Sequence, residues 1–167
     1  MSRTARLLVA TGAILLICVG SATAWVMTHR EAPLLPPRIT EQASFVMYVP
    51  GSDWQTDAEE ATIRNGFLTL HASRGNDSLI ITQQAIPEVF DDVPQYYPQL
   101  ISRLNKYASF GTVNGTVYLT KPKELNGQQQ AVLSNNGTLL FAHPSHNLDS
   151  DSWRRFFNSL IIVKPTD

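Results

Sequence analysis

The sequence has little of what several common protein classes require. Its 167 residues include one cysteine, which excludes a disulfide framework and a cysteine-based zinc site. Charged residues make up only 16% and the net charge is −1, so the chain lacks the basic excess with which nucleic-acid-binding proteins neutralise phosphates. It contains neither a Walker A motif nor G-x-G-x-x-G, so we expect no nucleotide binding.

One long uncharged run stands out against this low charge content. Residues 7–27 are 21 consecutive uncharged residues, and as a helix they would span about 31 Å, which matches the hydrocarbon core of a bilayer. Arg3 and Arg6 precede the run, so the positive-inside rule leaves residues 1–6 in the cytoplasm. We therefore expect a transmembrane signal anchor at 7–27 in a single-pass protein of the cell membrane, with an extracytoplasmic C-terminal domain.

A cleaved signal peptide is the alternative interpretation of the same segment. Arg3 and Arg6 would form its charged region, and Ala22-Thr23-Ala24 matches the small-residue pattern of a cleavage site. Cleavage after Ala24 would release the rest of the chain as a secreted or periplasmic protein. Both interpretations export everything that follows the apolar run.

A proline-containing segment follows the predicted anchor. Residues 28–41 include three prolines, and proline favours extended backbone because its ring fixes φ and it lacks an amide donor. We expect a semi-stiff linker at 28–41 that reaches about 40 Å, then a folded domain at 42–163 and a short tail at 164–167. The only cysteine precedes this domain, so its stability has to come from a packed core.

Apolar periodicity and turn dipeptides predict two groups of strands, each followed by a helix. The predicted strands occupy residues 43–49, 67–73, 78–85, 116–120, 129–134 and 138–142. Asn-Gly dipeptides precede three of them and favour tight hairpins, because both turn positions tolerate positive φ. A middle helix is predicted by five residues at helical spacing, Tyr97, Leu100, Ile101, Leu104 and Tyr107.

A second helix is predicted to begin near Asp149, because an aromatic stripe follows that residue and acidic side chains favour a helix N-terminus. The element order therefore predicts an α+β fold. We expect an antiparallel β-sheet, built from two meanders, with one face covered by the two amphipathic helices.

Four segments form a series along residues 43–163: SFVMYVPGSDW, SLIITQQ, a Gly-x-Val at 111–113 and WRRFFNSLIIV. In this order they resemble PsbP/Mog1-like domains. The chain also resembles the small DUF4367-type domains that follow single anchors in bacterial envelope proteins. Both resemblances imply a non-catalytic accessory or interaction module, and neither supplies catalytic residues.

The candidates for chemistry gather before the last helix. His143 and His146 lie close to Asp149, and two imidazoles with a carboxylate can hold a transition metal. In the simpler interpretation, this is a polar loop whose acids cap the helix. The alternative is a metal site, and with it a metal-dependent hydrolase that uses His143 and His146. The simpler interpretation leads us to expect no cofactor.

The candidates for a binding surface are aromatic. Trp54 follows a Pro-Gly turn, and Tyr96 begins the predicted middle helix. Exposed strand edges or the corner around Trp54 would suit a partner protein. We therefore expect a membrane-anchored extracytoplasmic accessory domain that binds another protein of the bacterial envelope. The alternative is a secreted module that binds a small or lipidic ligand.

Overall fold

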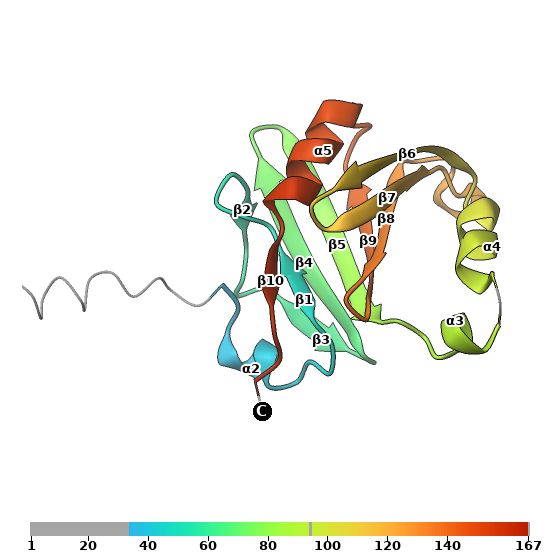
Figure 1. Ribbon diagram of the computed structural model, residues 1–167. Coiled ribbons are helices and arrows are strands. Elements are labelled where there is room, and N and C mark those ends of the chain that lie inside the picture. The colour runs from blue at the N-terminus through green and yellow to red at the C-terminus, as the bar shows by residue number, and fades with distance from the viewer. Residues whose placement is uncertain (1–33, 94, 167) are drawn as a thin grey trace, which may run out of the picture. The chain divides into compact units, whose positions relative to one another are not determined.

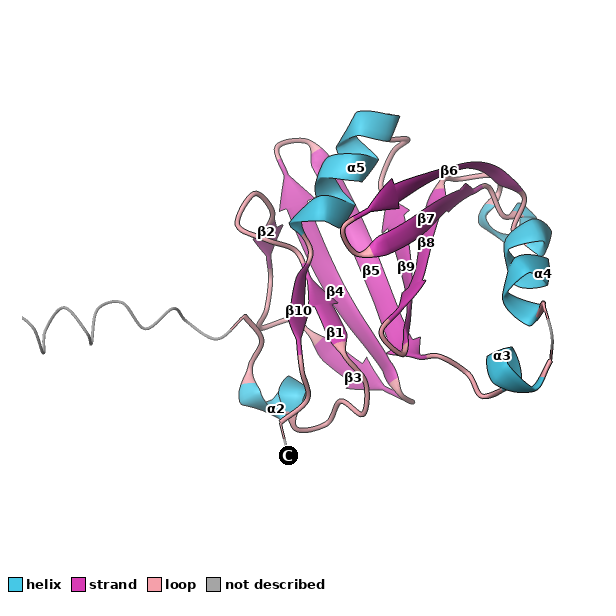
Figure 2. Cartoon of the chain, in the orientation of Figure 1, coloured by secondary structure: helices cyan, strands magenta, loops and turns pink. Residues whose placement is uncertain are grey.

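The computed structural model describes residues 34–93 and 95–166 (Figure 1). The predicted anchor at 7–27 lies outside the described residues. Within the described part of the chain, no helix has the length and apolar character needed to cross a bilayer. A compact unit begins at Leu34, and it is a mixed α+β domain built on antiparallel strands (Figure 2).

The larger sheet has eight strands and joins two meanders through its centre. Its order is β2-β4-β5-β9-β8-β7-β6, and β3 pairs with the same strand as β2. The first meander consists of β2 (Gln55–Thr56), β3 (Thr62–Arg64), β4 (Phe67–Arg74) and β5 (Asp77–Ala85). The second consists of β6 (Lys106–Thr112), β7 (Gly115–Thr120), β8 (Gln130–Asn135) and β9 (Thr138–Pro144). The antiparallel pairing of β5 with β9 connects them.

Tight turns set the register of the hairpins as their sequences predict. The Asn65-Gly66 turn joins β3 to β4, and both residues have positive φ, at 52° and 79°. The Asn136-Gly137 turn between β8 and β9 has the same character, with φ of 50° and 75°. Two consecutive positive φ angles match the twist of paired strands, so these dipeptides close the hairpins with little strain.

One face of the sheet, called the inner face below, carries the main core. It is covered by α5 (Ser150–Ser159), by α2 (Pro37–Thr40) and by a small sheet of β1 (Met47–Val49) paired with β10 (Ile161–Val163). Trp153, Phe156 and Phe157 of α5 are fully buried there. The Asp149 carboxylate caps this helix, since its Oδ1 accepts a hydrogen bond from Ser152 N at 2.6 Å. The predicted start of the helix is confirmed.

Two buried glutamines attach the covering elements to the sheet. The Gln83 amide pairs with both backbone groups of Tyr48 in β1: Tyr48 N donates to Oε1 and Nε2 donates to Tyr48 O, each at 2.7 Å. The Gln129 amide pairs in the same way with Leu148, just before α5. Leu148 N donates to Oε1 at 2.8 Å, and Nε2 donates to Leu148 O at 3.1 Å. A side-chain amide has the same kinds of donor and acceptor as a peptide group. Each glutamine side chain therefore makes the two backbone hydrogen bonds that a neighbouring strand would otherwise make.

The opposite face of the sheet, called the outer face below, is covered only in part. Over β7–β9 lie α3 (Val89–Asp92) and α4 (Tyr96–Arg103), and their contacts form a second, smaller core around Ile101, Val132 and Leu139. The prediction that both amphipathic helices cover one face is therefore wrong: α5 and α4 lie on opposite faces. An amphipathic stripe indicates that a helix face is buried, but it does not specify which side of a sheet buries it.

The chain on either side of the predicted domain also folds. Leu35 and Ile39, in the predicted linker, are buried in the inner core, and Pro37 is the first residue of α2. Proline is favoured at that position because the missing amide would have no intrahelical partner. At the other end, Thr166 N donates to Thr40 O at 3.0 Å. The described domain therefore extends beyond 42–163 in both directions.

Candidate functional site

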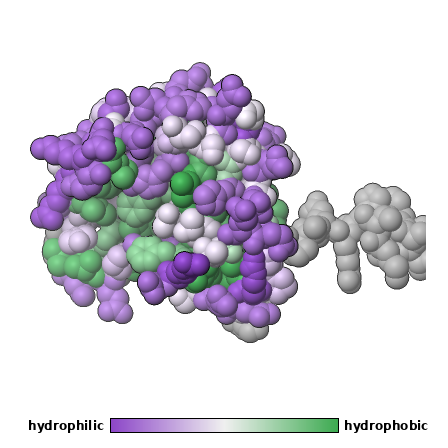
Figure 3. All heavy atoms as spheres, turned by 180° about the vertical axis from the view of Figure 1, so that it is seen from behind, coloured by the Kyte–Doolittle hydropathy of each residue, from purple (hydrophilic) through white to green (hydrophobic). Residues whose placement is uncertain are grey.

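The outer face of β4 and β5, called the open half below, is covered by no helix of the described residues. Side chains alternate along both strands, so Leu70 and Ile81 enter the inner core while Phe67 and Ile80 point outward. Phe67 is 42% exposed and Ile80 is 44% exposed. Seen from behind, apolar residues form several patches across the middle and the left of the molecule, with polar residues between and around them (Figure 3). Exposed apolar surface with a polar rim is typical of an interaction site.

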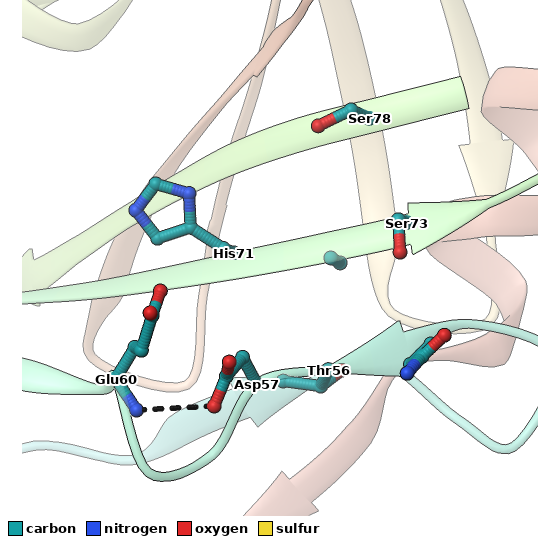
Figure 4. A pocket seen from close by; sticks show the side chains of 8 residues that line it. Thr56, Asp57, Glu60, His71, Ser73 and Ser78 are labelled. Carbon is teal, nitrogen blue, oxygen red and sulfur yellow. Dashed lines mark hydrogen bonds between the residues drawn. The ribbon is translucent and has the colours of Figure 1, made fainter. Parts of the chain in front are cut away.

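A polar groove lies at the β2–β4 edge of the open half (Figure 4). Its volume is about 490 Å³. Of its eight lining residues, Ala72 alone lacks a polar side chain, and the others are Gln55, Thr56, Asp57, Glu60, His71, Ser73 and Ser78. Strand β2, the turn that follows it, β4 and β5 each contribute to this lining.

Two hydrogen bonds shape the acidic turn of the groove and hold it beside β4. Asp57 N donates to His71 O at 3.3 Å, and Glu60 N donates to Asp57 Oδ1 at 3.2 Å. These bonds fix the path of residues 57–60 beside the strand that carries His71. One Asp57 oxygen is thereby occupied, while the Glu60 carboxylate makes no hydrogen bond to any described residue.

Two hydroxyl groups lie side by side in the groove. Ser73 and Ser78 are register partners on β4 and β5, and both line it. The Thr56 Oγ1 atom, which is buried and has no partner within the described residues, lies on the other side of the sheet, because Thr56 is the register partner of Ala72, whose side chain enters the inner core. The hydroxyls that face the groove are therefore those of Ser73 and Ser78.

The structure does not gather the predicted metal ligands into one site. His146 lies beside Asp77, with Nε2 and Oδ1 3.1 Å apart, and Asp149 caps α5. His143 lies on β9 with its Nε2 3.3 Å from Gln130 Nε2. Among the described residues, no group of three or more histidine, cysteine or acidic side chains is placed to hold a metal ion.

Hydrogen bonding shifts the pKa of Asp149, and burial shifts that of His143. Backbone and side-chain hydrogen bonds from Ser152 lower the pKa of Asp149, as expected for a helix cap. Burial lowers the pKa of His143, because a half-buried imidazole loses hydration when it is charged. A neutral His143 accepts at Nε2 from the Gln130 amide, and Gln130 Oε1 in turn accepts from Thr120 Oγ1 at 3.2 Å.

The two aromatic residues predicted for a binding surface have packing roles. Trp54 is only 4% exposed and packs edge-on against Phe156, with ring centroids 5.1 Å apart. The prediction that Trp54 forms a binding surface is therefore wrong, because its ring belongs to the inner core. Tyr96 is half-buried on α4 and packs against Phe90 at 5.2 Å.

The groove residues were missed by the sequence interpretation. Strand β2 is two residues long, which is too short for a periodic pattern, and Asp57 and Glu60 lie in a turn whose position depends on β4. Strand alternation places His71 on the opposite face from Leu70, and the structure shows its side chain exposed. That alternation was the available signal, since it places Ser73 on the same side as His71.

The chain matches no protein-family model, no curated protein and no solved structure.

Proposed function

We propose that this protein is a single-pass, membrane-anchored interaction domain of the bacterial envelope, with its C-terminal domain outside the cytoplasmic membrane. The uncharged run at 7–27 with arginines before it supports the anchor and its orientation. The proposal includes the likeness to PsbP/Mog1-like and DUF4367-type domains, which implies an accessory role without catalysis.

The start of the folded unit carries the proposal. The compact domain begins at Leu34, so six residues, 28–33, separate it from the proposed membrane span. Six residues reach at most about 20 Å, half of what the longer predicted linker allowed. A membrane-attached accessory subunit meets membrane-bound partners at high local concentration.

The open half of the outer face supports binding of a partner protein. Phe67 and Ile80 offer exposed apolar surface on two adjacent strands, and partly exposed hydrophobic residues of this kind form the centres of protein interfaces. The domain does not need this surface for its own core, because the inner face supplies that core.

A secreted ligand-binding module is the second candidate, and the polar groove favours it. In this version the chain is cleaved after Ala24 and acts through a soluble ligand. The two candidates share the folded domain and differ in whether the apolar run is retained. The third interpretation, a hydrolase using His143 and His146, gains no support, since these side chains have separate partners.

The mature N-terminus and the side of the membrane on which the C-terminus lies test the proposal. Intact-mass measurement of the purified chain should give the full-length mass, and a C-terminal reporter that requires export should be active. A mature chain that begins at Trp25 would support the secreted alternative instead. A reporter that is active only in the cytoplasm would overturn both.

A further inference from the structure

We propose that the free edge of β6 binds an extended, acidic segment of a partner protein, which pairs with β6 as an added strand. This inference goes beyond the proposed function. It concerns the end of the sheet that lies farthest in strand order from β2 and β4, and it does not depend on membrane anchoring.

Strand β6 is the last strand of the larger sheet. Among the described residues it pairs with β7 alone. In an antiparallel pair, every second residue directs its amide and carbonyl groups away from the partner strand, so part of the β6 backbone is free to pair with another strand. Extended peptides bind such sheet edges through main-chain hydrogen bonds.

The space beside this edge is open along the middle of the strand. Ser109 and Gly111 are exposed, and a Cβ atom on Gly111 would have no described neighbour within 4 Å. The register with β7 is irregular between Lys106 and Ala108, and it is continuous from Ala108 to Thr112. This continuous part of β6 is where an added strand can pair.

Cations lie over aromatic rings on both faces of this edge strand. Lys106 Nζ is 4.8 Å from the centroid of the Tyr118 ring, and the Arg154 Cζ atom is 4.9 Å from that of the Phe110 ring. Tyr118 packs against the smaller outer core, whereas Phe110 belongs to the inner core. An added strand would therefore have a cation near each of its two faces.

A further cation lies near the start of β6. Lys121 Nζ is 5.2 Å from the centroid of the Tyr107 ring, and Tyr107 is 47% exposed. Within the part of the chain that the structure describes, Lys106, Lys121 and Arg154 form no ion pair with a carboxylate. Contact with a ring holds a cation in place, and a carboxylate of a partner can still form a charge-assisted hydrogen bond with it.

These charges select an acidic partner segment. Lysine on an edge strand prevents non-specific pairing, because a second neutral or basic strand would have to bury or repel its charge. A segment with carboxylates opposite Lys106 and Arg154 meets no such penalty. The same residues that exclude other strands therefore give this edge its specificity.

Hydrogen–deuterium exchange, followed residue by residue by NMR, tests the inference on the full chain in detergent micelles. The probe is a short peptide of alternating glutamate and threonine residues with blocked ends, since threonine favours strands. We expect the peptide to slow the exchange of the β6 amides that face away from β7 by about tenfold. The amides of β10 should not change. Strand β10 is the matched control, because among the described residues it is also paired on one side only.

A second peptide separates backbone pairing from charge. It has the same sequence, but alternate amides carry N-methyl groups, which remove the donors that an added strand would supply. We expect it to bind at least roughly tenfold more weakly, because several main-chain hydrogen bonds are lost while every carboxylate is kept.

Two variants and a matched control test the charges. Lys106→Gln and Arg154→Gln each remove an exposed cation and should weaken binding of the unmethylated peptide about threefold, as is usual for exposed ion pairs. Together they should weaken it about tenfold. Lys164→Gln removes an exposed cation beside β10 and should have little effect.

Four results would overturn the inference. The first is unchanged exchange of the β6 amides at roughly 1 mM peptide, the weak limit of specific recognition. The second is equal binding of the methylated and unmethylated peptides. The third is equal loss of binding in Lys106→Gln and Lys164→Gln, which would mean a general charge effect. The fourth is equal protection of β6 by inorganic polyphosphate, which would make this edge a site for anionic polymers instead of a peptide strand.

Discussion

The two faces of the sheet differ in how completely they are packed. On the inner face, three aromatic side chains of α5 are fully buried, and glutamine side chains pair the backbone groups of the covering elements. On the outer face, α4 contributes one buried residue, Ile101, and the Tyr97 hydroxyl is buried with no partner in the part of the chain that the structure describes. The inner face therefore carries most of the folding free energy, which leaves the outer face available for binding.

The largest expected effect is a difference between core truncations on the two faces. Phe157→Ala should lower the free energy of unfolding by about 3–5 kcal/mol, because it leaves a cavity in the inner core. Ile101→Ala should cost about 2 kcal/mol, since the smaller outer core can relax around it. Urea denaturation measures both, and an equal or larger loss for Ile101→Ala would contradict the comparison.

The next effect concerns the glutamine that holds β1. Gln83→Leu keeps the size of the side chain but leaves Tyr48 N and O unpaired in the core, so it should cost about 2–5 kcal/mol. Gln84→Leu is the matched control, because Gln84 is the next residue of β5 and lies on the outer face. We expect that control to change stability by less than about 0.5 kcal/mol in the same urea titrations.

A pair of tyrosine substitutions compares a paired with an unpaired hydroxyl. The Tyr48 hydroxyl accepts from Asn136 Nδ2 at 2.9 Å, so Tyr48→Phe should cost about 1 kcal/mol. The Tyr97 hydroxyl is buried without a partner among the described residues, so Tyr97→Phe should be neutral or stabilise by up to about 1 kcal/mol. Thermal unfolding distinguishes the two, and a destabilised Tyr97→Phe would show that its hydroxyl is satisfied in solution.

The pH dependence of stability should identify the half-buried histidine on the outer face. Burial lowers the pKa of His143 below its ordinary value of 6.5, so the unfolded chain binds this proton more readily than the folded one. The stability that the folded chain has with a neutral His143 is therefore fully present above pH 6.5. It is lost as the pH falls through the folded pKa of His143. Between pH 7.5 and pH 5, the urea midpoint should fall less steeply for His143→Gln than for the unsubstituted chain. An unchanged slope would exclude His143 as a source of the pH dependence of stability.

The smallest stability effects are expected on exposed residues, where binding should change instead. Ile80 and Ile162 are similarly exposed, at 44% and 45%, but Ile80 is on the open half and Ile162 is on β10. Changing either to threonine should alter stability by less than about 1 kcal/mol. Crosslinked recovery of a partner from native membranes should drop about tenfold for Ile80→Thr, the loss expected at the centre of an interface, and stay unchanged for Ile162→Thr.

Local features of the fold could be predicted from the sequence, and the pairing of distant segments could not. The Asn65-Gly66 turn and the Asp149 cap depend on residues within a few positions of one another. The β1–β10 pairing joins residues more than a hundred positions apart, and β2 is defined only by its contact with β4. Tyr107 was placed on the middle helix, but Asn105 has positive φ and ends that turn before β6.

The sequence did contain a signal that both faces of the sheet are buried in part. The signal lies in the strands, because the apolar periodicity of the helices does not show which face a helix covers. In β8 and β9, apolar residues occupy consecutive positions, so that Val132 enters the outer core and Leu133 the inner core. Strands buried on both faces have continuous apolar runs of this kind, whereas β4 alternates. The groove had no comparable signal, since its acids come from a turn whose position is set by tertiary contacts.

Photocrosslinking in native membranes tests most directly whether the outer face binds while the inner face holds the fold. A crosslinking side chain is placed at position 80 or at position 162 of the full chain. We predict a discrete adduct from position 80 and none of that size from position 162. No adduct from position 80, or the same adduct in equal yield from both, would contradict the assignment of binding to the open half.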